Sequence, residues 1–145
     1  MQVKLLQSDS EIDVLCPVLL QLRPQYTTDS LIAQIKQQRS EGYQLAYVEA
    51  DGEVLCVAGF VIGNKLAWEK HIYVDDLVSS TRYRSRGAGA LLIDWLKQYG
   101  LDNDCKQLHL DSGVTRYQAH RFYLREHFSI NSHHFAITSL GSEGD

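Results

Sequence analysis

Hydrophobic positions recur with two different periods along the chain, and each period predicts its own type of element. Apolar residues at helical spacing predict one helix after Ser8 and another after Thr27 or Thr28, whose hydroxyl groups can cap a helix start. The inward positions are Ile12, Leu15, Leu19 and Leu22 in the first helix and Leu31, Ile32 and Ile35 in the second. Pro17 lies within the first pattern, so that helix is expected to start late or to kink.

Alternating or continuous apolar runs predict strands between and after these helices. The strand-like segments are 3–6, 43–50, 53–62 and about 65–78. Asp51-Gly52 is the two-residue sequence that most strongly indicates a hairpin, and Gly63-Asn64 is expected to form a second turn. Three of these strands are therefore expected to form an antiparallel meander.

The second half of the chain continues with alternating helices and strands. A helix is expected up to about Tyr99, closed by Gly100. It is followed by a strand at 106–111, a helix at 116–126 and one or two final strands within 128–139. This order predicts a mixed α/β (α+β) fold with parallel pairing around the third helix. Residues 1–140 are expected to form a single domain, with 141–145 as a disordered tail.

Composition and charge narrow the classes of function. The chain has 145 residues, 44% of them hydrophobic, and 14 basic against 18 acidic residues give a formal charge of -4. A broad basic surface for nucleic acid is therefore not expected. No segment reaches the roughly 20 apolar residues of a membrane span, and no signal peptide is recognisable, so we expect a cytoplasmic protein without membrane contact.

Cysteine and histidine spacing does not favour a metal site. Cys16, Cys56 and Cys105 are far apart and lack the paired spacing of zinc or redox motifs, so we expect reduced, buried thiols. His133 and His134 are neighbours that diverge on a strand, and no His-Glu-x-x-His helix is present. We therefore predict no metal.

The segment from Tyr83 to Ile93 carries two close glycines between a strand-like run and a helical run. Backbone N–H groups at the start of a helix lack partners and, with the helix dipole, favour an anion. Gly87 and Gly89 let that backbone approach a bulky phosphate, because a Cβ atom would obstruct it. The segment lacks the Gly-Lys-Ser/Thr end of a P-loop, and an ordinary tight turn before a helix is the alternative interpretation.

The spacing of Arg84, Gly87 and Gly89 resembles the Arg/Gln-x-x-Gly-x-Gly/Ala pattern of the GNAT superfamily of N-acetyltransferases. In that family the turn binds the pyrophosphate of acetyl-CoA. The resemblance implies a mostly antiparallel central sheet of about 6–7 strands flanked by about 4 helices. The implied coenzyme-binding residues are Leu77, Val78, Arg84, Arg86, Gly87, Ala88, Gly89 and Ala90.

A second GNAT-like signature lies in 119–128, where Tyr123 matches the family's tyrosine. The family assigns that phenol to protonating the departing coenzyme thiolate, although a core tyrosine is the alternative. Arg116 and His127 stand where many members carry asparagine and glycine. Since histidine resists the left-handed geometry that glycine accepts, we expect a different turn after this helix.

The resemblance implies direct transfer of an acetyl group to an amine, which must lose a proton. Asp76, Asp75 and Glu69 are the candidate proton acceptors, in that order. Adjacent strand residues face opposite sides, so one of the two aspartates is expected to point toward the cleft and the other away, and a bulge would alter which one does so. Arg23, Tyr26 and residues 131–135 are expected to shape the acceptor site.

Four functions remain open at this point. The leading one is a small-molecule N-acetyltransferase working in a ternary complex of enzyme, acetyl-CoA and amine. The others are a coenzyme A-binding sensor or partner domain without turnover, a protein amino-group acetyltransferase, and an unrelated α/β protein that binds a phosphate-bearing ligand. A homodimer through the last strands is also considered.

Overall fold

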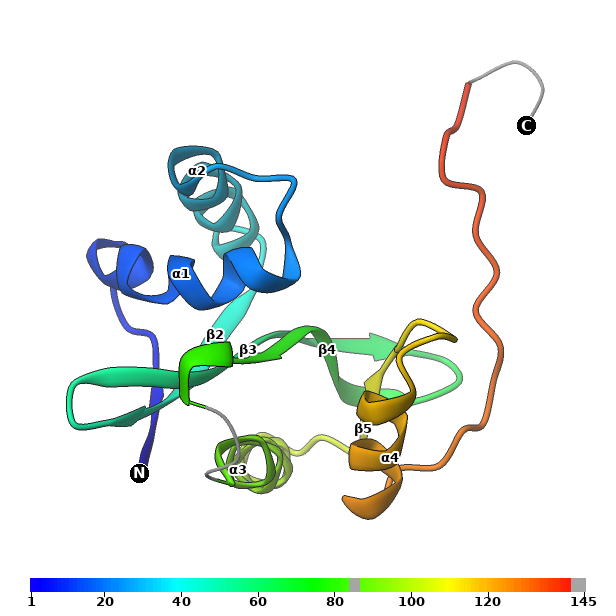
Figure 1. Cartoon of the computed structure of the whole chain (residues 1–145). Coiled ribbons are helices and arrows are strands. Elements are labelled where there is room, and N and C mark those ends of the chain that lie inside the picture. Colours follow the sequence, from blue (N-terminus) through cyan, green and yellow to red (C-terminus); the bar gives the residue numbers. More distant parts are fainter. Residues whose placement is uncertain (84–86, 142–145) are drawn as a thin grey trace. The chain divides into compact units, whose positions relative to one another are not determined.

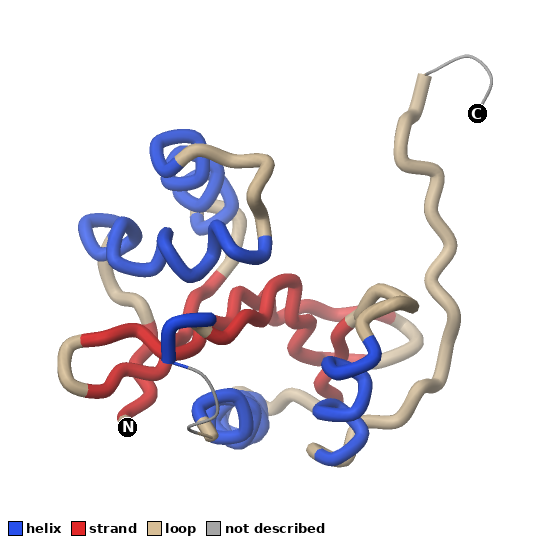
Figure 2. The backbone as a smooth tube through the Cα atoms, viewed as in Figure 1, coloured by secondary structure: helices blue, strands red, loops and turns tan. Residues whose placement is uncertain are grey.

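The computed structural model describes residues 1–83 and 87–141, and the chain divides into two compact units, Met1–Leu110 and Asp111–Asp145. Figures 1 and 2 show the path of the backbone and its helices, strands and loops. The prediction of a single domain over 1–140 stays a prediction.

The described part of the first unit contains five strands and three α-helices. In chain order they are β1 Gln2–Leu5, α1 Ile12–Leu22, α2 Thr28–Arg39, β2 Gln44–Ala50, β3 Glu53–Lys65, β4 Glu69–Ser79, α3 Ala88–Asp102 and β5 Gln107–Leu110. Short 3-10 turns lie at Asp9–Glu11 and Thr81–Tyr83. Most predicted elements therefore lie within a few residues of their expected positions.

The five strands form one sheet in the order β1-β2-β3-β4-β5. The first four pair antiparallel, and β5 pairs parallel to β4 after the crossover through α3. The mixed, mostly antiparallel fold and the parallel pairing around the third helix are thus confirmed. The expected count of six to seven strands is too high, because the described residues form five.

Capping side chains define where the first two helices begin. Ser8 and Glu11 form a capping box before the 3-10 turn that leads into α1, and Thr27 forms one with Ser30 at the start of α2. Thr27 is therefore the cap, which the sequence left open between two threonines. Pro17 lies inside α1, which begins at Ile12 after the 3-10 turn.

The helices of the first unit lie on opposite faces of the sheet, as Figure 1 shows. Helices α1 and α2 cover a buried cluster that includes Leu15, Leu45 and Val57. On the other face, the ring of Phe60 makes edge contacts with Trp95 and Tyr99 of α3. Burial of these side chains against the sheet supplies the main stabilisation of this layered arrangement.

Two expectations based on glycine are wrong: the turn at Gly63-Asn64 and the end of the third helix at Gly100. The pairing of β3 with β4 continues through Gly63 and Asn64, and the chain reverses only after Lys65. Helix α3 runs past Gly100, where a Cβ atom would lie 3.2 Å from the Ile72 side chain. Gly100 therefore permits close packing of α3 on β4 and does not end the helix.

The second unit contains α4, Tyr117–Arg125, within its described residues. His127 follows it with a φ of 74°, and Phe128 N–H donates to the Tyr123 carbonyl oxygen, as in a Schellman cap. The expectation that histidine would avoid this geometry is wrong. The hydrogen bonds of this cap satisfy carbonyl groups at the end of α4. Their gain in free energy outweighs the strain of one left-handed residue.

Residues 128–139 form no strand, so the predicted final strands are wrong. Alternation of apolar residues favours an extended backbone, but a strand also requires another strand at hydrogen-bonding distance. The side chains of Ile130, Phe135 and Ile137 are exposed. Residues 142–145 of the expected tail lie outside the described residues.

Three further expectations concern cysteines, metals and membranes. Cys16, Cys56 and Cys105 are free and buried, as predicted, and burial raises the pKa of the Cys56 thiol to about 11. The described residues contain no group of three side chains suited to hold a metal ion. None of their helices has the length and apolar character to cross a bilayer.

Candidate functional site

A β-bulge in β4 determines how the two adjacent aspartates lie. Gly59 of β3 pairs with Asp76, whereas the next residue, Phe60, pairs with Val74. Asp75 is therefore an extra residue in β4, and such an insertion re-aims the side chains that follow. Both aspartates line the same cavity, so the expectation that they face opposite sides is wrong.

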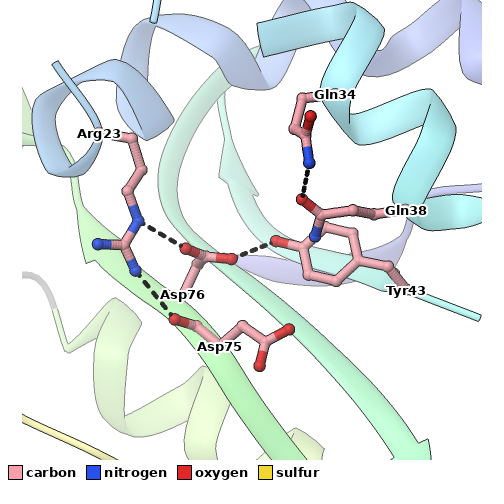
Figure 3. A network of polar contacts seen from close by, with 6 residues as sticks. All are labelled: Arg23, Gln34, Gln38, Tyr43, Asp75 and Asp76. Carbon is pink, nitrogen blue, oxygen red and sulfur yellow. Dashed lines mark hydrogen bonds and ion pairs between the residues drawn. The ribbon is translucent and has the colours of Figure 1, made fainter. Parts of the chain in front are cut away.

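The carboxylate of Asp76 is held by two partners from other elements, as Figure 3 shows. Arg23, at the end of α1, donates from Nε to one carboxylate oxygen at 2.9 Å. The hydroxyl of Tyr43 donates to the other oxygen at 2.6 Å. Asp76 is largely buried, with 14% of its side chain exposed, so these bonds satisfy a charge removed from water.

Tyr43 reaches Asp76 by lying directly over Gly59. A Cβ atom on Gly59 would stand 1.6 Å from the Tyr43 hydroxyl oxygen, a separation that no side chain tolerates. Burial, and then the charge of Asp76, raise the pKa of the Tyr43 phenol well above its ordinary value. The hydroxyl therefore stays protonated and acts as a donor to Asp76.

Asp75 is bound differently from its neighbour. Its backbone carbonyl oxygen accepts a hydrogen bond from Arg23 Nη2 at 3.1 Å, while its side chain is exposed to the cavity. Partial burial, and then the charge of Asp76, raise the pKa of the Asp75 carboxyl above its ordinary range, with Arg23 acting in the opposite direction. Asp75 thus holds a proton more readily than a free aspartate does.

The cavity beside these groups has a volume of about 280 Å³ and lies between α1, α2 and β4. Arg23 and Tyr26, which sequence reasoning placed at the acceptor site, are among its lining residues. The full lining comprises Leu19, Arg23, Gln25, Tyr26, Leu31, Gln34, Ile35, Gln38, Tyr43, Asp75 and Asp76. The contributions of Tyr43 and Gly59 to this site had no signal in the sequence, because they depend on which strands become neighbours.

Glu69 lies at the opposite end of β4 from the two aspartates. Six residues of extended strand separate it from Asp75, which corresponds to about 20 Å. Glu69, the first residue of β4, has a φ of 54°, and its carbonyl oxygen contacts His71 Nδ1 at 2.9 Å. The structure therefore does not bring Glu69 together with Asp75 and Asp76.

In the described residues, the pairing of β4 with β5 ends immediately before the aspartates. Strand β5 pairs with residues 71–74 of β4, and its last paired residue is Leu110, opposite Val74. Within the described sheet, residues 75–79 of β4 have no partner on the β5 side. Leu77 and Val78, predicted to contact the coenzyme, lie in this segment and are half-buried.

The start of α3 carries the predicted phosphate cradle. Gly87 is the residue before the helix, with a φ of 75°, and no side chain caps the first turn in the described residues. Its carbonyl oxygen accepts from Leu91 N–H at 3.1 Å, the first bond of the helix. The N–H groups of Ala88, Gly89 and Ala90 precede that bond and have no acceptor within the helix. Arg84 and Arg86 lie outside the described residues.

Tyr123 belongs to the second unit. It is buried on α4, with 9% of its surface exposed, and makes edge contacts with the rings of Phe122 and Phe128. In the same unit, residues 131–135, expected to shape the acceptor site, lie in a segment without a strand. His134 Nδ1 lies 3.2 Å from Asp111.

The sequence and the fold were compared with those of known proteins. An "Uncharacterized N-acetyltransferase YhdJ" of Bacillus subtilis (strain 168) is 25% identical over 135 residues, which cover 92% of this chain and 95% of that protein. The structure of aminoglycoside N-acetyltransferase AAC(6')-Iy in complex with CoA superposes with a TM-score of 0.82 at 13% identity, covering 96% of this chain and 94% of that one.

A ribosomal-protein-alanine N-acetyltransferase from Brucella melitensis biovar Abortus 2308 superposes with a TM-score of 0.83 at 16% identity, covering 96% of this chain and all of that one. These two structures establish the fold. The sequence model of the acetyltransferase (GNAT) family matches residues 11–128, which is most of the chain. The protein therefore belongs to the GNAT family of acetyltransferases.

Proposed function

We propose that this protein transfers the acetyl group of acetyl-CoA directly to a small primary amine, in a ternary complex of enzyme, acetyl-CoA and amine. The observation that carries the proposal is the end of β4–β5 pairing at Val74, immediately before Asp75 and Asp76. The unpaired strand edge would bind the coenzyme. The neighbouring cavity, with its two carboxylates, would bind the amine. Membership of the GNAT family supports the same reaction.

The proposed coenzyme site joins this edge to the first turn of α3. Leu77 and Val78 would flank the pantetheine arm, and the N–H groups of Ala88, Gly89 and Ala90 would bind phosphate oxygens. The space next to Gly87 suits this role, because no atom of the described residues beyond its chain neighbours lies within 4 Å of the position of a Cβ atom there. Arg84 and Arg86 are proposed to add positive charge beside the pyrophosphate.

In the proposed reaction, the neutral amine nitrogen attacks the thioester carbon and the carbon–sulfur bond breaks. Counted from the bound ammonium, which loses one proton before the attack, the products are an amide, the CoA thiol and that proton. We assign the ammonium proton to Asp75, directly or through water, because its carboxyl has a raised pKa and faces the cavity. Asp76, preferred on sequence alone, becomes a positioning residue since Arg23 and Tyr43 occupy both its oxygens.

Tyr123 is proposed as the general acid that protonates the thiolate of CoA. A tyrosine has an ordinary pKa of about 10, which matches the basicity of a departing thiolate closely enough for proton transfer. The proposal rests on the family resemblance of residues 119–128 and on the position of Tyr123 in that motif.

The function is tested in two steps with purified protein. Acetyl-CoA at saturating concentration should raise the melting temperature, and thiol release should then depend on an added amine.

Tyr123→Phe should lower kcat by roughly tenfold or more with little change in acetyl-CoA affinity. Tyr117→Phe is the matched control, because Tyr117 is an exposed tyrosine on the same helix.

Each outcome separates the competing functions. Absence of any stabilisation by acetyl-CoA would overturn the proposal. Stabilisation without thiol release across the amine panel would favour a coenzyme A-binding domain without turnover. Release that requires a peptide amine, with no rate for small amines, would favour a protein amino-group acetyltransferase.

A further inference from the structure

The charges that line the cavity between α1, α2 and β4 leave one negative charge unmatched. Its lining includes two carboxylates, Asp75 and Asp76, and one guanidinium, that of Arg23. Arg23 forms its ion pair with Asp76 at 2.9 Å, and Tyr43 occupies the second oxygen of that carboxylate. Among the described residues, no hydrogen-bond donor contacts the carboxylate of Asp75. The cavity is therefore complementary to a single positive charge.

The rest of the lining is apolar or neutral. Leu19, Leu31 and Ile35 are buried and belong to the hydrophobic cluster under the two helices. The lining also includes three amide side chains, those of Gln25, Gln34 and Gln38, of which Gln34 donates to Gln38 at 2.9 Å. That bond leaves the Gln38 amino group and the Gln34 carbonyl oxygen able to bind a neutral polar group.

The volume restricts the size of the occupant. A cavity of about 280 Å³ is slightly smaller than the roughly 300–1,000 Å³ of most small-molecule sites. This volume favours a short aliphatic molecule over several residues of a protein substrate.

We infer that the acceptor is a short primary amine with one positive charge, an apolar middle and a neutral hydrogen-bonding group at its far end. Amino alcohols and amino amides have this chemistry. The ammonium binds Asp75, the chain lies along Leu19, Leu31 and Ile35, and the far end binds Gln38. A diamine would place a second charge among amides with no carboxylate to pair with it. This inference rests on the proposed acetyltransferase function.

The test uses four acceptors: aminopentanol, pentylamine, pentanediamine and a short peptide with a free N-terminus. We expect aminopentanol to have the highest kcat/KM at saturating acetyl-CoA. Pentanediamine should be about tenfold less efficient, which corresponds to about 1.4 kcal/mol of binding free energy. Higher efficiency for the diamine or the peptide would overturn the inference.

Two variants assign the ends of the acceptor. Gln38→Leu should remove the preference for aminopentanol over pentylamine, measured as the ratio of the two kcat/KM values. Gln37→Leu is the matched control, since Gln37 is on the same helix but bonds to Glu41 and does not line the cavity. A preference that persists in Gln38→Leu would contradict the assignment of the far end.

Calorimetry of the amines with the protein alone separates this inference from the proposed function. Aminopentanol should bind more tightly than pentanediamine, and Asp75→Asn should abolish binding of both. If the amines bind in this order but no thiol is released with any of them, the acetyltransferase proposal fails while the ligand class is upheld. If thiol is released but the order is reversed, the ligand class fails and the enzyme function stands.

Discussion

The first turn of α3 and the cavity between α1, α2 and β4 are held together in different ways. The turn is built from consecutive backbone groups, and one left-handed residue, Gly87, sets its geometry. The cavity depends on side chains brought together from distant segments, since Arg23 and Asp76 are 53 residues apart. The turn should therefore be sensitive to backbone strain, and the cavity to the loss or displacement of single side-chain atoms.

The largest effect is expected from Gly59→Ala. The added methyl group would stand 1.6 Å from the Tyr43 hydroxyl oxygen, so Tyr43 must leave Asp76. Overpacking together with an unsatisfied carboxylate should lower the free energy of unfolding by about 3 kcal/mol, measured by urea denaturation. Gly63→Ala, on the same strand with its nearest atom at 3.7 Å, should have little effect. Equal losses in both variants would refute a specific role for the contact between Gly59 and Tyr43.

Tyr43→Phe removes the hydroxyl and keeps the ring. Because the lost hydrogen bond goes to a carboxylate, we expect a loss of about 2 kcal/mol in the free energy of unfolding. Tyr99→Phe is the comparison variant, because its hydroxyl donates to the neutral amide oxygen of Gln44 at 2.7 Å. That loss should be about 1 kcal/mol. A smaller loss for Tyr43→Phe than for Tyr99→Phe would argue against a charge-assisted bond.

Gly87→Ala tests the backbone turn. Apart from its chain neighbours, no described residue has an atom within 4 Å of the new methyl group, so the expected loss of about 1 kcal/mol is attributed to the left-handed φ. Gly52→Ala should lose a similar amount, because Gly52 has a φ of 77° and equally open surroundings. Stabilisation by acetyl-CoA, measured as the shift in melting temperature, should fall only in Gly87→Ala. Equal shifts in both variants would remove Gly87 from the proposed cradle.

The smallest effect on stability is a gain from Asp75→Asn. The folded protein holds the Asp75 proton more tightly than the unfolded chain does, so ionisation of this group opposes folding at pH values above its raised pKa. Because the side chain is exposed, screening limits the gain at neutral pH to roughly half a kcal/mol.

This gain should shrink as the pH falls through the raised pKa and should vanish below the unfolded value of about 3.9, where the carboxyl is protonated in both states. Urea denaturation at several pH values measures it. The same variant should lose amine transfer, which would identify a charge kept for function at the expense of stability. A variant that is less stable than the parent at neutral pH would contradict the raised pKa.

Local patterns predicted the regular parts of the fold well. The helical repeats before Gly42, the hairpin at Asp51-Gly52 and the crossover around α3 all involve residues close together in sequence. The errors occurred where a glycine or an alternating run had a different tertiary role. Gly100 packs against Ile72, the pairing of β3 with β4 continues through Gly63, and the segment 128–139 has the alternation of a strand without forming one.

The candidate site likewise has features that local sequence predicts and features that depend on tertiary structure. The glycines of the α3 turn and the pair of aspartates were visible in the sequence, because each depends on neighbouring residues. Their orientation was not, since the bulge at Asp75 exists only through the register of β4 against β3. Register is set by side-chain packing over the whole sheet, and a shift of one residue reverses every side chain that follows.

The amino-acid sequence by itself determined the mixed fold, the resemblance to the GNAT family and the glycine turn, because periodicity and short motifs are local properties of the chain. Only the tertiary structure decided that Asp76 is paired with Arg23 and hydrogen-bonded by Tyr43 while Asp75 is left facing a small cavity. The physical reason is that a carboxylate acquires its charge state and accessibility from partners that folding brings to it.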